Sequence, residues 1–305
     1  MNEELLITEE SIFQVPLLVP MAAKYFEKIG NKNNDEYYRS VDIRLCLEKI
    51  CDNYIYEFID DKDKEKWNKK GMVLHNKLQV AKNYLDSDIV EALIAAKNIG
   101  NKGAHEGEEA SYCEKDFEVA QTAIFNFSLE VLVFYFKKYG YAKMNKEGSW
   151  VPYIFSTLPP LYRVKVLRRY FETNPEHIVI EKLAMAYTKA RMNKEMVEFL
   201  DLCLDVGHIN KYQYDSLIEE MKQIEECLDK FPIARNMKEA KENFLVACKR
   251  VAMECDISQE PFILLMSLIF YGSKDEILSE KEKNVQTDRD LRSSMIINWH
   301  IVEEK

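Results

Sequence analysis

A chain of 305 residues is long enough for about two domains, yet it contains only 9 glycines and 8 prolines. So few turn-forming residues exclude β-sandwiches, β-barrels and collagen-like chains, and they favour an all-α fold of long helices with short connections. The 42 basic and 52 acidic residues give a net charge of −10, which argues against a broad surface for duplex nucleic acid but allows a small basic pocket for a single strand.

Residues 1–140 are expected to form an antiparallel helical bundle, because apolar residues recur there at helical spacing. The predicted helices cover residues 20–30, 36–59, 67–85, 88–99 and 114–139. The glycine-dense segment GNKGAHEGEEAS at 100–111 is expected to be a loop that ends the fourth of these helices. Aromatic side chains crowd the last helix too densely for one face, so another subunit or the second half of the chain is expected to cover some of them. They are Phe125, Phe127, Phe134, Tyr135 and Phe136.

The second half is expected to contain shorter, paired helices. Residues 141–158 are basic with isolated aromatics and are predicted to be a linker, and residues 159–272 are predicted to form a helical-hairpin, solenoid-like domain. The polar residues 273–305 are expected to be a loosely ordered tail. The predicted helices cover residues 159–173, 174–190, 193–206, 210–230, 236–255 and 261–271.

The sequence also bears on compartment and cofactors. Its seven cysteines include no C-x-x-C pair, so we expect free buried thiols in a reducing compartment and no metal site. The opening residues MNEELLITEESIF lack the order of a signal peptide, and no unbroken apolar run reaches about 18 residues. We therefore expect a cytoplasmic protein without a membrane segment. Nucleotide-binding loops and common hydrolase motifs are absent from the sequence, so no cofactor is expected.

One pattern in the first half carries chemistry. The predicted helix VDIRLCLEKICDNY at 41–54 has Arg44 and Glu48 four residues apart, and the segment DIVEALIAAKNIGNKGAHE at 88–106 ends in Lys-x-x-Gly-Asn-x-x-x-His. Together with the long closing helix, this pattern resembles the HEPN superfamily (higher eukaryotes and prokaryotes nucleotide-binding), in its branch with an R-x-x-G-N-x-x-A-H signature. The resemblance covers roughly residues 20–140, and Lys97 stands where the signature has arginine.

The resemblance implies an all-helical bundle that often forms a homodimer, with the motif near a shared cleft. Active members of the family are metal-independent RNases that occur beside restriction and anti-phage genes. In them the histidine transfers a proton while the ribose 2′-hydroxyl attacks the adjacent phosphate, and the arginine engages that phosphate. On this chain the catalytic positions are His105, Asn101 and Lys97, and the expected cleft residues are Arg44, Glu48 and Lys102.

The chemistry of these residue types agrees with that role. Histidine titrates near neutral pH, so His105 can accept a proton from a hydroxyl and return one to a leaving oxygen. Lys97 can steady the charge on the phosphate but cannot form the bidentate fork of arginine. As the cation at a predicted helix end, Lys97 would also complement the helix dipole. RNA cleavage and RNA binding without cleavage therefore both remain open.

Each motif residue has a structural alternative as well. Arg44 and Glu48 have the spacing of an ion pair along one helix, Asn101 is of a type that caps turns, and Gly100 with Gly103 would terminate a helix. The remaining histidines have no visible partners and are expected to be structural: His75, His177, His208 and His300.

The stretch 163–207 resembles a tetratricopeptide-type helix pair, in which Asn174-Pro175 closes one unit. One unit is not an array, because such units bury their faces against neighbours, so a generic helical bundle is the alternative. The stretch also contains a basic cluster, for which a solvated helix face and a nucleic-acid guide are the two interpretations. Its members are Arg163, Lys165, Arg168 and Arg169.

Two functions are consistent with these observations. The first is an intracellular HEPN-like protein that binds single-stranded RNA and cleaves it through His105, in a prokaryotic defence or toxin setting. The second is a non-catalytic dimeric adaptor that binds a protein partner through residues 159–272. Lys97 and the acidic charge favour the adaptor, whereas the Gly-Asn-x-x-x-His segment and the basic linker favour RNA. We take the RNA function as the first hypothesis.

Overall fold

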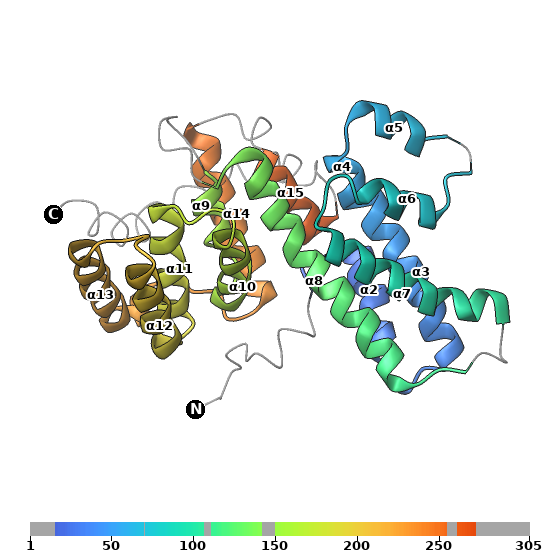
Figure 1. The fold of residues 1–305 in the computed structure, drawn as a ribbon, viewed down its shortest axis with the longest axis horizontal. Coiled ribbons are helices and arrows are strands. Elements are labelled where there is room, and N and C mark those ends of the chain that lie inside the picture. The colour runs from blue at the N-terminus through green and yellow to red at the C-terminus, as the bar shows by residue number, and fades with distance from the viewer. Residues whose placement is uncertain (1–15, 70, 107–110, 142–149, 255–260, 273–305) are drawn as a thin grey trace, which may run out of the picture.

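The computed structural model describes residues 16–69, 71–106, 111–141, 150–254 and 261–272, with the backbone alone for residues 103–106 and 254. The predicted tail at 273–305 lies outside the described residues. The described part is all-α, as predicted, and contains no β-strand. Figure 1 shows two groups of helices that meet along the long helix α8 (Glu114–Tyr139).

The first group begins and ends where the sequence predicts, but two of its predicted helices are not continuous α-helices in the structure. The predicted helix 36–59 contains a π-helical turn, which is rare and frequently accompanies functional sites. The predicted helix 67–85 is interrupted at Gly71, whose φ of 93° is a conformation that L side chains rarely adopt. The elements are α2 (Pro20–Gly30), α3 (Glu36–Ile50), the π turn (Cys51–Ile55), α4 (Tyr56–Phe58), α5 (Asp61–Trp67), α6 (Leu74–Ala81), α7 (Ser87–Glu106) and α8.

Helix α7 differs most from its prediction, because it continues through the glycine-dense segment to Glu106. The reason lies at Gly100, where an added Cβ would stand 3.1 Å from the Ser40 carbonyl oxygen and 3.2 Å from the Arg44 backbone nitrogen. Gly100 thus lets the backbones of α7 and α3 approach closely, and the prediction that it ends the helix is wrong.

The start of α7 also differs from the sequence pattern, in which Asp88 and Glu91 have the spacing of a capping box. The carboxylate of Asp86 accepts a hydrogen bond from the Asp88 backbone N–H at 2.9 Å, and Glu91 forms an ion pair with Lys82 at 2.6 Å. Glu91 is therefore engaged away from the helix terminus, and Asp86 supplies the capping contact.

A buried arginine joins three helices of the first group. Arg39 of α3 is only 2 % exposed and forms two 2.9 Å hydrogen bonds with the Glu114 carboxylate at the start of α8. Its Nε donates to the Ile29 carbonyl at 2.8 Å, and its guanidinium lies 3.8 Å from the centre of the Phe117 ring. Such a bidentate, stacked arrangement suits arginine and not lysine.

This ion pair makes stability depend on pH. The Arg39 guanidinium holds the pKa of Glu114 below its ordinary value of 4.5, so the contribution is complete above about pH 4.5 and is lost as the pH falls through the folded-state pKa. Because Glu114 is 37 % exposed, we expect Glu114→Gln to lower the free energy of unfolding by only about 1 kcal/mol at pH 6. Urea unfolding should show that this difference narrows at pH 3, and the exposed Glu118→Gln should show no comparable loss.

The second group follows its predicted order closely. Its elements are α9 (Val151–Phe155), α10 (Pro160–Phe171), α11 (His177–Lys189), α12 (Asn193–Asp205), α13 (Lys211–Glu226), a 3₁₀ turn (Leu228–Lys230), α14 (Met237–Glu254) and α15 (Pro261–Tyr271). Asn210 and Gln213 form the reciprocal capping box that their spacing indicates. The predicted linker 141–158 contains α9, whose Ile154 and Phe155 are buried. The last part of the predicted linker therefore belongs to the packed structure.

The two groups share an aromatic core around α8. The ring of Phe136 lies 4.9–5.7 Å, centre to centre, from four rings on the far side of α8. Those rings belong to Tyr141, Phe155, Tyr170 and Phe262. The second half of the chain therefore covers Phe136 and also contacts Tyr135 through Phe262, which is one of the two arrangements that the sequence suggests. Phe127 and Phe134 contact rings of the first group instead.

Helix α8 is also the one described helix that is long and apolar enough to span a membrane, with a mean hydropathy of 1.5 over its apolar window. Polar residues such as Asn126, Ser128 and Glu130 interrupt its apolar residues, so the sequence contains no unbroken apolar run there. However, 72 % of that window is buried inside the protein, which is typical of the core helix of a soluble protein.

Candidate functional site

The continuation of α7 places the three motif residues along one side of a single helix. Lys97, Asn101 and His105 are four residues apart, so each is rotated by about 40° from the one before, and the three span about 12 Å of the helix axis. The sequence predicted instead that Asn101 and His105 lie in a loop, which is wrong for their backbone. The His105 side chain lies outside the described residues.

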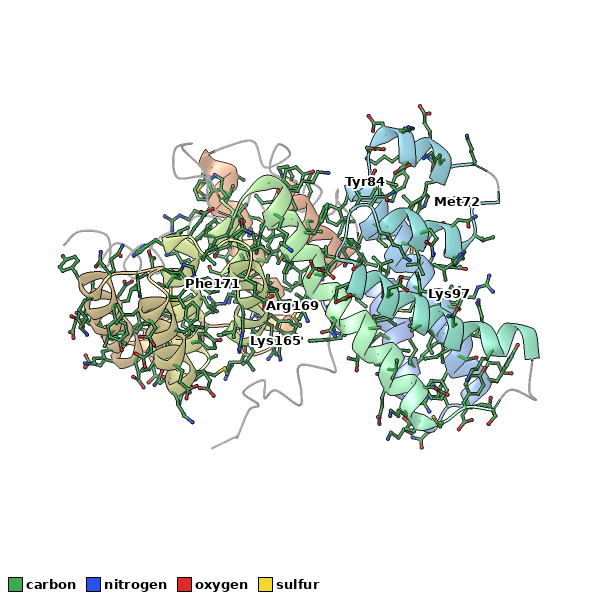
Figure 2. All side chains as sticks on the ribbon, in the orientation of Figure 1. Met72, Tyr84, Lys97, Lys165, Arg169 and Phe171 are labelled. Carbon is green, nitrogen blue, oxygen red and sulfur yellow. The ribbon has the colours of Figure 1, made fainter. Side chains whose placement is uncertain are left out.

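Lys97 is a buried cation without an acidic partner. Its side chain is only 8 % exposed. Its amino group contacts an imidazole and no carboxylate: Nζ lies 3.5 Å from Nδ1 of His75 on α6. Within the described ranges no carboxylate lies within ion-pairing distance of Nζ. Lys97 sits well inside α7 (Figure 2), so the explanation that it complements the end of a helix is wrong. Burying an ammonium without a counter-charge is costly, and the charge remains available to an anion.

His75 is a site residue that sequence reasoning missed. It was expected to be structural, yet it is exposed on α6 beside Lys97. A lysine ammonium can only donate, so in this contact Nδ1 accepts, and the proton of a neutral imidazole is then carried by Nε2. The two residues are 22 positions apart on different helices, so no local motif in the sequence signals their contact.

The neighbouring lysine shows the contrast. Lys77, two residues after His75 on α6, forms an ion pair with Asp52 of the π turn. Asp52 also accepts a 3.2 Å hydrogen bond from the Trp67 indole N–H. The charge of Lys77 is thus neutralised within the protein, whereas the charge of Lys97 is not.

Arg44 and Glu48 form the ion pair that their spacing predicts, with Nε 3.3 Å from Oε1 and both side chains about two-fifths exposed, at 42 % and 37 %. Arg44 lies at the crossing of α3 and α7, because its backbone nitrogen faces Gly100. In the described part of the chain only Nε of the guanidinium is engaged. The two Nη groups of Arg44 therefore remain available to an anion beside α7.

Not every expected cleft residue joins this cluster. Lys102 extends toward the start of α8, where Nζ lies 3.8 Å from Asp116 and 5.9 Å from the Tyr112 ring. On α7 it is rotated by about 140° from Lys97. Asn101 is half-buried inside the helix, so the alternative that it caps a turn is wrong.

The basic cluster of the second half does not form one solvated face. Arg163 is buried, and Arg169 points back toward α8, where it donates to the Asn126 carbonyl at 3.0 Å and to its side-chain oxygen at 2.7 Å. Figure 2 shows Arg169 and Lys165 on α10 beside α8. Of the four residues in the cluster, only Arg168 has an exposed side chain.

Metal ligands do not gather in the described residues, where no group of three or more His, Cys, Asp or Glu side chains could hold an ion. The described cysteines are all free thiols, and burial raises the pKa of Cys46 and Cys51 well above the ordinary range. Buried thiols of this kind are inert as nucleophiles.

Comparisons with protein-family models, with curated proteins and with solved structures found no match to this chain. The chemistry available to the site therefore follows from its own residues.

Proposed function

We propose that the chain binds single-stranded RNA across the side of α7 that carries Lys97, Asn101 and His105, and that it cleaves the RNA without a metal ion. The observation that carries this proposal is the unbroken helix through Glu106. It arranges a buried unpaired cation and a histidine position on one line, next to an arginine whose Nη groups are open. The resemblance to the HEPN superfamily supports the same assignment and suggests a defence or toxin setting.

The proposed reaction is transesterification within the RNA. His105 accepts the proton of a ribose 2′-hydroxyl, and the 2′-oxygen attacks the adjacent phosphorus while the bond to the 5′-oxygen of the next nucleotide breaks. The imidazolium returns the proton to that leaving oxygen. Lys97 and Arg44 offset the negative charge that grows on the phosphate oxygens. The products are a 2′,3′-cyclic phosphate and a 5′-hydroxyl end.

The Lys97→Met variant tests the binding step. Methionine has a similar shape, and replacing an uncompensated buried charge with an apolar group is often neutral or stabilising, so the fold is retained. We expect RNA affinity to fall about tenfold or more, because one phosphate contact is lost. Fluorescence anisotropy with labelled single-stranded RNA measures this, and the exposed Lys115→Met is the matched control. An equal effect of the two variants would contradict a role for Lys97.

The Lys97→Arg variant separates binding from catalysis. If the missing guanidinium fork limits the rate, this variant retains RNA affinity and cleaves faster than the wild type. Unchanged affinity with slower cleavage would assign Lys97 to positioning within the buried contact with His75.

The oligomeric state is a further expectation, drawn from the family resemblance. Light scattering at micromolar concentration is expected to give twice the chain mass of 35.9 kDa. A monomer would show that the cleft is built from one chain, which the internal covering of the α8 aromatics already permits.

A second candidate function is the adaptor, which one observation favours. Three large apolar side chains at the α12–α13 turn are exposed, Leu202 by 54 %, Val206 by 61 % and Tyr212 by 82 %. Leu202 and Val206 are one helical turn apart, and neighbouring exposed apolar groups are typical of protein-binding surfaces. If the chain is an adaptor, replacing all three with serine removes a co-purifying partner, and the wild-type chain does not cleave RNA. The full chain is the appropriate bait, because the rings of α8 form part of the core of the second half.

A further inference from the structure

Arg163 of α10 is a buried arginine whose charge has no partner. It is only 6 % exposed, and its Nε is fully buried without a hydrogen-bond acceptor. Across the described residues its guanidinium forms no hydrogen bond and no ion pair. Two other arginines differ: the buried Arg39 contacts a carboxylate and a carbonyl, and the partly buried Arg169 contacts two oxygens of Asn126.

A second cation, Lys189, interacts electrostatically with Arg163 from α11, which packs against α10. Lys189 is the last residue of α11. It is partly buried, and its amino group lies 4.6 Å from the centre of the Phe231 ring. Burial, together with the positive charges of Arg163 and Lys182, lowers the pKa of Lys189 to about 7. No ion pair of Lys189 occurs in the part of the chain that the structure describes.

The surrounding groups do not supply the missing negative charge. Glu181 is already paired with Lys182 at 2.6 Å. Burial raises the pKa of Tyr141, so its hydroxyl stays neutral beside Arg163. Burial also lowers the pKa of Arg163, but only to about 10, so the guanidinium remains charged at pH 7.

The end of α11 is too weak to replace an anion. The carboxyl end of a helix acts as roughly half a negative charge, whereas this site holds one permanent and one titrating positive charge. A buried charge without a counter-charge is costly, and two that repel each other cost more. The arrangement is therefore complete only when an anion is bound.

We propose that Arg163 and Lys189 form a binding site for the phosphate group of a small molecule, between α10 and α11. A phosphate dianion matches two cations in charge. The guanidinium offers it a bidentate fork, and the ammonium adds a point charge. This site lies in the second group of helices and does not depend on the RNA function proposed for α7.

Binding at this site is coupled to protonation. The charged and titratable groups that face Lys189 and Arg163 are each other, Lys182 with Glu181 on α11, and Tyr141 before α9. Of these, Lys189 changes charge near neutral pH, so an anion binds more tightly at pH 6 than at pH 8 and binding takes up a proton. Sulfate is the suitable probe for this comparison, because its charge stays constant over that range.

Calorimetric titration of the full chain with inorganic phosphate, and then with glycerol 3-phosphate, tests the site and distinguishes free phosphate from a phosphate ester. Binding is expected for the wild type and is lost, by tenfold or more, in Arg163→Met and in Lys189→Met. The matched control is Lys194→Met, whose side chain is 85 % exposed on α12, and it binds as the wild type does. Equal binding by all four proteins, or no binding by the wild type, overturns the proposal.

Thermal unfolding in chloride buffer provides the second readout. Without an anion, Arg163→Met removes an uncompensated charge and is expected to melt no lower than the wild type. Phosphate at about tenfold over its dissociation constant is then expected to raise the melting temperature of the wild type alone, by roughly 2–4 °C. If Arg163→Met instead melts several degrees lower and the wild type ignores phosphate, an acid of this chain already neutralises Arg163. In that case the phosphate site is refuted.

Discussion

The His105→Ala variant is expected to lose RNA cleavage by about 100-fold or more, the usual range for removal of a general acid–base group. The reason is that the proposed mechanism gives proton transfer to His105, whereas Lys97 and Arg44 offset the charge on the phosphate and the amide of Asn101 serves as a hydrogen-bonding group. The position of His105 within α7 is helical, and alanine is the best helix former, so the helix is retained. Single-turnover cleavage of a labelled single-stranded RNA measures the loss.

The control for this variant is His177→Ala, which replaces an exposed histidine at the start of α11. It is expected to cleave at the wild-type rate. His75→Ala adds a comparison within the site: a partial loss would assign His75 to holding Lys97, and a complete loss would make it the second proton-transfer group. Wild-type activity in His105→Ala would remove that residue from the mechanism.

The Gly100→Val variant is expected to lower the free energy of unfolding by about 3 kcal/mol or more. Even a Cβ at this position would meet Ser40 and Arg44 at 3.1 and 3.2 Å. The contacted atoms belong to the backbone of α3, which cannot turn aside as a side chain would. The two methyl groups of valine must then separate α3 from α7. Urea-induced unfolding followed by circular dichroism gives this value.

Ala95→Val on the exposed side of α7 is the matched control, because it introduces the same β-branched residue into the same helix. Its expected cost is about 0.5 kcal/mol, the difference in helix propensity. A loss of similar size in Gly100→Val would mean that the two helices tolerate a wider crossing than the close approach at Gly100 indicates.

Parts of this fold can be predicted from the sequence because local chemistry determines them. Helix α2 begins at Pro20, and α8 ends just before Gly140, where φ is 84°. In these places a proline or a glycine decides the backbone directly. The capping box of Asn210 and Gln213 likewise depends on four neighbouring residues.

The errors arise where distant residues decide. Glycine that ends a helix and glycine that lets two helices cross look alike in a sequence, and Gly100 is of the second kind because α3 lies against it. The contact between Lys97 and His75, and the absence of an acid beside Arg163, are likewise visible only in three dimensions. The spacing of the motif residues is visible in the sequence, but the sequence does not reveal that one continuous helix carries all three of them.

The most direct test of the proposed function compares single-stranded RNA with DNA of the same sequence, incubated with the wild-type chain and a metal chelator. Our account predicts that the RNA alone is cut, leaving 2′,3′-cyclic phosphate and 5′-hydroxyl ends, because the attacking group is the 2′-hydroxyl and its activation needs only a base and local positive charge. Three results would contradict the account: cleavage of the DNA as well as the RNA, cleavage only when a metal ion is restored, or neither binding nor cleavage of the RNA.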